Sequence, residues 1–528
     1  MSNFKTLMMK NLKNNLINFK NNIVKNQFNS RIILALTLIV FYSCTSEDFL
    51  EKAPLNELTA EASYVKKSDA EAAIGACYGM MFDWQQHHYK WTRLVFSDMR
   101  ADNGHGGAGA MYMAAERHEP NASDYEPGGY AWDQPYSYIA AANSVLDNVP
   151  NIDDPNFSDA EKNVILGQAY FLRGYQYMQL ARIFGDVPLH LSTDDKEMYK
   201  PQSSQAEIFA QVEADMLLAE NLLPLEHSTN FLTRSRATKG AAQTMLAKVY
   251  AETRDFDKCA EYAAKVINSG VYQLVDTFDH LWDGFHEFTT EAIWEGVHIA
   301  GGQQASTYHQ VQMLPPGSMS QYDGNKPGES WPVAYPRFNT LHSELVAAFE
   351  TMGDSIRSYS SYVTVSDRSL ISEHPYGYSE NEPISHVYKL GRTAGIFDGM
   401  NVMILRLADV ILLRAEALNQ SGKTGEAIAL LNQVRARVKL APTTATSKAD
   451  VAKAILDERR LELFMENNRY WDLKRYYNND AAFVQYLNSL SESSGKSLEY
   501  KATLNNIFMP IPQKEMDINE FLIQRPGY

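Results

Sequence analysis

The stretch NVMILRLADVILLRAEALNQSGKTGEAIALLNQVRARVKLAP, residues 401–442, predicts two helices joined by a tight turn. The first, from about Val402 to Gln420, is apolar almost all round, which is typical of a buried helix. Gly422 stands where a left-handed residue would end that helix. The second helix places its apolar side chains on one stripe at helical spacing: Ala427, Ile428, Leu430, Leu431, Val434 and Val438.

Such helical hairpins are the unit of tetratricopeptide-like proteins, which repeat about every 34 residues, and one unit alone cannot bury its apolar faces. A second unit is predicted at residues 241–270, where Arg254 and Asp255 form the turn between two apolar stripes. The helices at 161–184 and 204–223 predict a third. We therefore expect a scaffold of several packed hairpins.

Other helices are expected from start signals and from apolar periodicity. The pattern Ser-x-x-Glu is typical of a capping box at a helix start, and it occurs at Ser68–Glu71 and at Ser204–Glu207. Residues 91–127 are rich in Gly, Asp, Asn and His and are expected to be irregular. Helices are predicted again at 135–148 and at 449–477.

Residues 276–399 lack helical periodicity and are rich in Gly, Pro, Ser and aromatic residues. A structureless loop of this length is implausible in a compact domain. We therefore expect a loop-rich, aromatic-rich sub-region with short strands, such as Glu291 to Ile299, packed on the helices. The predicted fold class is all-α, mainly helical. Its parts are helices at about 68–270, the loop-rich region at about 276–400 and a C-terminal hairpin with terminal helices at about 401–528.

The N-terminus predicts export. The first 43 residues contain six Lys or Arg and no Asp or Glu, and residues 32–42 form an apolar run too short for a stable membrane anchor. Cys44 then stands where bacterial lipoproteins are acylated, so residues 1–43 are predicted to be a lipoprotein signal peptide and Cys44 the lipidated residue. Acyl chains hold a protein to a membrane without a spanning helix. An ordinary cleaved signal with a chance cysteine is the alternative.

Charge and cysteine content exclude some classes of function. The net charge of −16 argues against a nucleic-acid partner, which would require a basic face. The remaining cysteines, Cys77 and Cys259, lie on apolar helical stripes and are expected to be buried thiols rather than a disulfide.

No motif predicts a metal or a cofactor. GHGGAG at 104–109 matches G-x-G-x-x-G, but no apolar strand precedes it, so a surface loop is expected. Four histidines lack tight ligand spacing and are expected to be solvated: His87, His88, His105 and His118. A structural calcium ion on loop carboxylates is left open.

The sequence also predicts no catalysis. Carboxylates lie at helical spacing beside arginines near residue 460, namely Asp457, Glu458, Glu462 and Glu466 beside Arg459, Arg460 and Arg469. An ion-pair network of this kind keeps carboxylates ionised, whereas a glycosidase needs one carboxyl of raised pKa. The chain has no G-x-S-x-G nucleophile elbow either.

Several segments together resemble the SusD/RagB family of outer-membrane nutrient-binding lipoproteins. The long helix that runs into Gly-Asp-Val-Pro at 185–188 resembles a family motif. ILRLADVILLRAEALNQSG at 404–422 is similar to the family's Arg-Tyr-Ala-Asp-Val hairpin, with Leu407 where Tyr is usual. ERRLELFMENNRYWDLKR at 458–475 resembles its Glu-Arg-Arg segment, with Asn467-Asn468 where Glu-Gly is common. The ending MPIPQKEMDIN…RPGY resembles its Pro-Ile-Pro tail.

The resemblance implies a protein on the outer surface, paired with a TonB-dependent, SusC-like barrel, that binds oligosaccharides without altering them. It also implies a ligand face made by loops after the first helices together with the irregular central region. Glycan binding uses flat aromatic faces with amides and charges. The residues of these types that we predict to contact a glycan are Trp84, Trp91, Asp102, Asn103, Tyr112, Trp282, Tyr322, Trp331 and Tyr335.

For any single aromatic residue in this set, core packing is the alternative, and Trp84 continues an apolar helical stripe. Three other functions are compatible with the sequence. They are capture of oligopeptides in the manner of RagB, hydrolysis of a glycan at the surface, and a scaffold that binds only other proteins.

Overall fold

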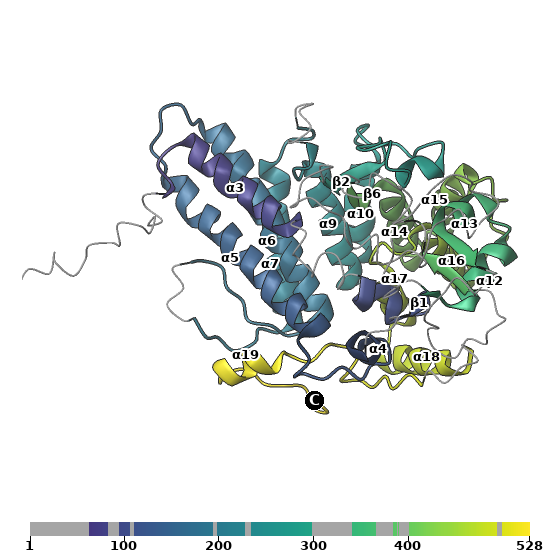
Figure 1. Cartoon of the computed structure of the whole chain (residues 1–528). Helices are drawn as coiled ribbons and strands as arrows, with labels where there is room; N and C mark the ends of the chain where they lie inside the picture. Colours follow the sequence, from purple (N-terminus) through teal and green to yellow (C-terminus); the bar gives the residue numbers. More distant parts are fainter. Residues whose placement is uncertain are drawn as a thin grey trace, which may run out of the picture. The chain divides into compact units, whose positions relative to one another are not determined.

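The computed structural model describes residues 63–82, 94–105, 110–193, 198–227, 234–297, 340–365, 384–387, 389, 401–493 and 499–528. Helices dominate these residues, which confirms the predicted fold class (Figure 1). Residues 64–528 fall in one compact unit. Within the described part, no helix is long and apolar enough to cross a membrane.

The hairpin that the sequence predicts at 401–442 is present, but its first helix is shorter than expected. Helix α14 spans Leu407–Gln420 and helix α15 spans Thr424–Arg437, and the two pack together. Gly422 has the left-handed φ of 80° that ends the first helix. Residues Val402–Arg406 form strand β6 instead, which pairs antiparallel with β2 (Ala292–Gly296). An apolar run of this length fits a buried strand as well as a buried helix.

The other predicted hairpins are confirmed. Helices α9 (Lys239–Glu252) and α10 (Phe256–Ile267) are joined at Arg254, whose φ is 62°. Helices α6 (Asp159–Phe184) and α7 (Gln205–Leu222) also pack side by side. Each hairpin contacts the next, since α7 packs on α9 and α10 packs on α14 (Figure 1).

Small residues set the distance between α6 and α7. A Cβ added at Gly174 would lie 2.9 Å from Met216 Cε and 3.1 Å from Asp215 Cβ. Beside this contact, the buried Arg173 guanidinium donates to both oxygens of Asp215 at 2.9 and 2.7 Å. Close packing and a charged pair therefore fix the same helix crossing.

The capping boxes were only partly predicted. Ser204 caps α7 with Glu207, as expected. Helix α3 begins at Lys67 rather than after Ser68, because the Asp69 carboxylate accepts the Val65 and Lys66 N–H groups at 3.0 Å. A capping box that the sequence analysis missed, Ser158 with Glu161, starts α6 two residues earlier than predicted.

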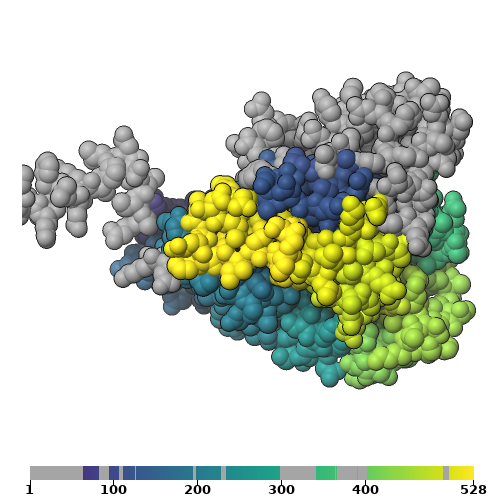
Figure 2. Space-filling model, turned by 90° about the horizontal axis from the view of Figure 1, so that it is seen from below, coloured from purple at the N-terminus to yellow at the C-terminus, as the bar shows by residue number. Residues whose placement is uncertain are grey.

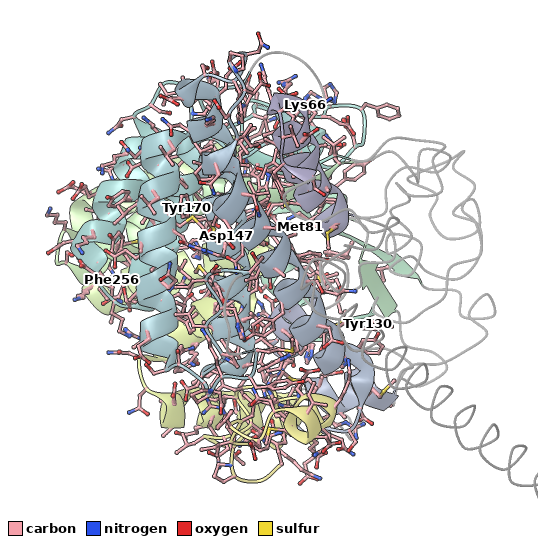
Figure 3. All side chains as sticks on the ribbon, turned by 90° about the vertical axis from the view of Figure 1, so that its left-hand side faces the viewer. Lys66, Met81, Tyr130, Asp147, Tyr170 and Phe256 are labelled. Atoms are coloured by element: carbon pink, nitrogen blue, oxygen red, sulfur yellow. The ribbon has the colours of Figure 1, made fainter. Side chains whose placement is uncertain are left out.

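Helices α3 (Lys67–Phe82), α5 (Tyr130–Asn148) and α6 pack against one another at one end of the hairpin array. Figure 3 shows them side by side, with Lys66 and Met81 at opposite ends of α3. The sequence places the start of α5 at Pro135, but the helix begins at Tyr130 and includes that proline. Both predicted thiols, Cys77 and Cys259, are free and buried.

Two stretches that the sequence analysis expected to lack helices contain short ones. In the stretch predicted to be irregular, a π-helix (η3) spans Val95–Met99, α4 spans Ala110–Glu116 and a second π-helix (η4) begins at Tyr125. In the loop-rich region, α12 spans Ser343–Met352 and α13 spans Ser355–Ser361. These helices are too short for their apolar period to emerge from the sequence.

Four short strands form an antiparallel sheet in the order β1-β3-β5-β4. They are β1 (Gly104–His105), β3 (Thr340–Leu341), β5 (Ile384–Val387) and β4 (Tyr362–Val365). Gly104 pairs with Leu341 and His105 with Thr340, while His386 of β5 pairs with Thr340 on one side and Val363 on the other. The sheet thus joins strands from far apart in the chain.

Helices follow the α14–α15 hairpin at about 449–477, as predicted. They are α16 (Lys448–Glu462) and α17 (Arg469–Tyr477), separated at Met465 and Asn467, whose φ values are 59° and 63°. Two further helices follow, α18 (Asp480–Ser493) and α19 (Gln513–Ile518).

The C-terminal tail binds to earlier parts of the chain through backbone hydrogen bonds. Met509 N–H donates to the Ile183 carbonyl and Gln513 N–H to the Ala122 carbonyl, both at 2.8 Å. Figure 2 shows these yellow residues spread over one face, beside the blue residues near 120.

Candidate functional site

The four-stranded sheet brings together the ends of the segments that carry most of the predicted ligand residues. Strand β3 begins at Thr340, directly after the segment with Tyr322, Trp331 and Tyr335. Its partner β1 follows η3, and η3 begins just after the segment with Trp84 and Trp91. Strand β1 also packs on η3. The end of the segment that follows α3 and the end of the central region are therefore held by one structural element.

The nine predicted ligand residues divide into two groups. Trp84, Trp91, Tyr322, Trp331 and Tyr335 lie outside the described residues. The other four are buried in the protein, with exposed fractions between 0% and 4%: Asp102, Asn103, Tyr112 and Trp282. Since burial leaves these four side chains without a free face, the structure favours a scaffold role for them over contact with a ligand.

Asp102 is the carboxylate of a buried charge cluster. It accepts hydrogen bonds from Arg469 Nε and Nη2 at 2.6 and 2.7 Å and from the Tyr486 hydroxyl at 2.6 Å. Arg460 Nη2 lies 3.4 Å away. Burial alone would raise the pKa of Asp102, but Arg460 and Arg469 outweigh burial and hold that pKa well below its usual range. The side chain is thus a permanent anion that ties η3 and β1 to α16, α17 and α18.

The other three buried residues join the same region to the scaffold. Asn103 donates to Asp98 at 2.7 Å and accepts from Arg460 Nε at 2.9 Å. Tyr112 of α4 belongs to the apolar core. The Trp282 ring lies under the ammonium group of Lys389, whose nitrogen is 4.2 Å from the ring centre. This ring is therefore covered on that face by a buried cation.

The predicted ion-pair network exists, although its partners differ from those expected. Glu458 pairs with Arg357 and Arg435, Glu466 pairs with Arg406 and Lys389, and Glu462 pairs with three arginines, Arg357, Arg406 and Arg437. The neighbouring arginines point elsewhere, since Arg459 binds Asp409 and Asp472, and Arg460 and Arg469 bind Asp102. Asp457 pairs with Lys453 at the exposed surface.

Electrostatics in this network oppose acid–base chemistry. Burial alone would raise the pKa of Glu462, but Arg437, Arg406 and Arg357 lower it well below its usual range. A carboxylate held ionised by several arginines cannot deliver a proton as a glycosidase acid does. Geometry and charge therefore assign these residues to the scaffold.

Two of the histidines expected to be solvated are buried instead. His118 accepts a hydrogen bond from Arg100 Nη2 at 2.9 Å, and its other ring nitrogen lies 3.2 Å from the Arg100 carbonyl. Burial and the adjacent Arg100 lower the pKa of His118 to about 3, so the ring is neutral. His105 binds the Glu116 carboxylate at 2.9 Å. His87 and His88 lie outside the described residues.

The described surface also carries concave sites that the sequence analysis missed. A groove of about 670 Å³ lies between α5, the residues near Tyr199 and α19, and it is lined by Trp132, Tyr136, Met198 and Tyr199 among others. Met198 and Tyr199 are 74% and 45% exposed. Tyr199 lies in the connection between α6 and α7, a position that composition alone does not distinguish.

A second cavity of about 360 Å³ is lined by Arg234, Tyr272, Phe288 and Glu295, among others. Burial raises the pKa of Glu295 to about 7. Its carboxyl accepts from the Phe288 N–H at 3.1 and 3.2 Å and from the Asn401 amide at 3.0 Å. Protein groups thus occupy both oxygens of this carboxyl.

Comparison with known sequences gives a consistent result. Residues 349–528 match the model of the SusD family, and residues 48–251 match a model described as starch-binding associating with outer membrane. A SusD-like protein of Formosa agariphila is 27% identical over 487 residues, which cover 84% of this chain and 90% of that protein. A SusD-like protein of Bacteroides ovatus is 24% identical over 84% of this chain and 82% of its own length.

Solved structures share the fold. A laminarin binding SusD-like protein superposes with a TM-score of 0.71 at 24% identity, covering 88% of this chain and all of that one. Surface glycan-binding protein A from Bacteroides uniformis gives a TM-score of 0.73 at 22% identity, over 87% of this chain and 99% of its own. The two family models cover most of the chain between them, and the helical scaffold agrees with them. The chain belongs to the SusD/RagB family.

Proposed function

We propose that this protein binds oligosaccharides or polysaccharide fragments at the cell surface and delivers them, unaltered, to a TonB-dependent, SusC-like outer-membrane barrel. The observation that carries the proposal is the sheet β1-β3-β5-β4. It supports a single ligand face because it holds the end of the loop region after the first helices beside the end of the aromatic-rich central region.

The ligand face would be made by Trp84, Trp91, Tyr322, Trp331 and Tyr335, the predicted ligand residues that lie outside the described part of the chain. A sugar ring presents an apolar C–H face that stacks on a flat aromatic side chain, while neighbouring polar groups bind its hydroxyls. The name of a similar protein supports this class of ligand, since that protein is laminarin-binding.

The absence of a chemical step is part of the proposal. The carboxylates Glu458, Glu462 and Glu466 are paired with cations. Their role is to hold the elements of the scaffold together rather than to transfer protons, so binding would leave the glycan intact.

Delivery requires the protein to stay near the barrel. A lipid on Cys44 would hold the mature chain at the outer membrane, in agreement with the outer-membrane description of the family model that matches residues 48–251. Moderate affinity would suit this role, because the ligand must leave the protein to enter the barrel.

Affinity electrophoresis of residues 45–528 against a panel of polysaccharides tests the proposal, followed by isothermal titration with oligosaccharides of the retarding glycan. Retardation by one glycan class, with the glycan recovered at its original length, is the expected result. Shortened products would instead show hydrolysis. If no glycan retards the protein, a peptide panel in the same titration decides whether the ligand is an oligopeptide.

Substitutions locate the site. Trp91→Ala and Trp331→Ala are each expected to weaken binding about 30-fold, because truncating a central aromatic anchor costs about 2 kcal/mol. Tyr199→Ala is the matched control, since it removes an exposed aromatic ring from the groove beside α19. If both tryptophan variants keep their glycan affinity and the tyrosine variant loses it, the ligand site lies in that groove instead.

A further inference from the structure

Three side chains capable of binding a metal ion converge on an exposed turn that the proposed function does not use. His280 lies in the short 3-10 helix η6 (Phe278–Leu281), and Asp283 and His286 follow it at intervals of three residues. One ligand atom from each of the three lies within 4.8 Å of the others. This group is not apparent from the sequence, because the three residues form a cluster only when the chain turns here.

The Asp283 carboxylate is fixed by the turn itself. One oxygen accepts the backbone N–H groups of Phe285 and His286 at 2.8 and 3.1 Å. The other oxygen lies 2.7 Å from Nδ1 of His286. The position and direction of the carboxylate are thus set before any ion arrives, which lowers the entropic cost of binding.

The two imidazoles are adjacent and accessible. Their ring centres are 3.9 Å apart and the rings are nearly parallel, at 17°. The His286 side chain is 50% exposed and that of Asp283 is 16% exposed. Rotation of a histidine ring about χ2 is soft, so an exposed ring can turn its nitrogen toward a shared ion without disturbing the core.

A second histidine–carboxylate group, His105, Glu116 and His342, shows why exposure matters. It is buried, and its polar atoms form a closed chain in which the Tyr500 hydroxyl lies 3.3 Å from Glu116 and 3.2 Å from His342. Its rings also stack, with centres 4.0 Å apart. Turning either ring toward an ion would break that chain inside the packed core, so this group is a structural network.

We propose that His280, Asp283 and His286 bind one divalent first-row transition metal ion, of which Zn²⁺ is the representative. Two imidazoles and a carboxylate suit Zn²⁺, with bonds of about 2.0–2.2 Å. Such ligands do not suit Ca²⁺, which takes oxygen ligands only. Because the turn is exposed, water would complete the coordination.

The ion would stabilise the turn, which is itself linked to the sheet region. Within the turn, the Asp279 carboxylate accepts a hydrogen bond from the Ser360 hydroxyl of α13 at 2.5 Å. Helix α13 leads directly into β4 of the sheet. Binding is therefore expected to raise the melting temperature, since an ion that binds only the folded chain stabilises it.

Isothermal titration of Zn²⁺ into chelator-treated residues 45–528, prepared without a polyhistidine tag, tests the proposal. One site is expected, with Co²⁺ giving visible absorption bands that Zn²⁺ abolishes, and with weaker binding at about pH 5.5 than at about pH 7.5 because the ligands must be deprotonated. His280→Ala, His286→Ala and Asp283→Asn should each lower the affinity about 10-fold or more, equivalent to about 1.4 kcal/mol.

Glu261→Gln is the matched control, because it removes an exposed carboxylate from α10. Unaltered circular dichroism of the variants shows that the fold is retained. Three results would overturn the proposal: no Zn²⁺ binding, equal Zn²⁺ affinity in all four variants, or a preference for Ca²⁺ over Zn²⁺.

Discussion

Replacing Asp102 by Asn separates a scaffold role from a ligand role. In the structure, this carboxylate binds two arginines and a tyrosine and is 3% exposed. The substitution keeps the size of the side chain and one acceptor oxygen, but it removes the negative charge. Arg460 and Arg469 then remain close together without their shared anion.

The expected cost is large. Removing one partner of a buried ion pair destabilises a protein by about 3–5 kcal/mol, because the other charge stays buried and unpaired. The retained amide oxygen keeps part of the hydrogen bonding, so we expect a value near the lower end, about 3 kcal/mol. The control Asp457→Asn breaks an exposed pair with Lys453, and pairs of this kind contribute about 0–1 kcal/mol.

Equilibrium urea unfolding of residues 45–528, followed by circular dichroism, measures both variants. The pKa of Asp102 is lower in the folded chain than its unfolded value of about 3.9, so its stabilisation is complete above that pH and is lost only as the pH falls through the folded value. The difference between wild type and Asp102→Asn should therefore stay constant from about pH 5 to about pH 8.

Glycan titration at a temperature where both proteins are folded completes the experiment. A scaffold role predicts similar affinity for Asp102→Asn and wild type. A variant within about 0.5 kcal/mol of wild-type stability, the range of ordinary surface substitutions, would refute the assignment of Asp102 to a buried charge cluster. Loss of glycan binding without loss of stability would restore the ligand role.

Two further predictions concern packing and pH. Gly174→Ala should destabilise the protein by about 1–3 kcal/mol, because its Cβ would meet Met216 and Asp215 of α7. Gly425→Ala in α15 is the control: a Cβ there has nothing within 4 Å, so this variant should be stabilised by about 0.5–1 kcal/mol. Equal shifts of the two variants in thermal melts would contradict the close approach of α6 and α7. The pKa of Glu295 is raised to about 7 by burial, so folding loses stability as the pH rises from about 4.3 to about 7, and Glu295→Gln should gain about 3 kcal/mol relative to wild type over that interval. The free energy of unfolding of wild type and Glu295→Gln is measured at both ends of this interval. If the difference between the two proteins is the same at both pH values, Glu295 ionises freely in the folded chain.

The hairpins could be predicted from the sequence because their information is local. Apolar residues at helical spacing and a glycine at residue 422 specify α14, its end and α15 within one stretch of chain. Strand β6 was assigned to the helix because its apolar run matches either structure, and only its pairing with β2, more than a hundred residues earlier, decides between them.

The site residues required contacts that the sequence does not display. Asp102 and Asn103 have the polarity of ligand residues, but their partners Arg460 and Arg469 are over 350 residues away, so their burial could not be predicted from the sequence. The ion-pair network near residue 460 was expected, yet the cations that bind Glu462 come from three other elements: α13, β6 and α15. Residue type predicted the chemistry, and only the fold could assign the partners.

The position of the buried charges suggests why a family with this scaffold can differ in its ligands. A buried ion pair is a poor source of net stability, since desolvation offsets its attraction, but it strongly penalises any arrangement that leaves a charge unpaired. Here such pairs clamp Asp102 next to β1, Arg357 just before β4, Lys389 just after β5 and Arg406 at the end of β6. Strand β1 follows the segment that carries Trp84 and Trp91, and the sheet that contains β1, β4 and β5 also contains β3, which follows the segment that carries Tyr322, Trp331 and Tyr335. Fixing these strands holds the scaffold next to those segments in place, and two solved structures at 24% and 22% identity share the fold, with TM-scores of 0.71 and 0.73. Loop substitutions should accordingly alter the ligand at little cost in stability, whereas substitutions in the clamps should alter stability and leave the choice of ligand unchanged.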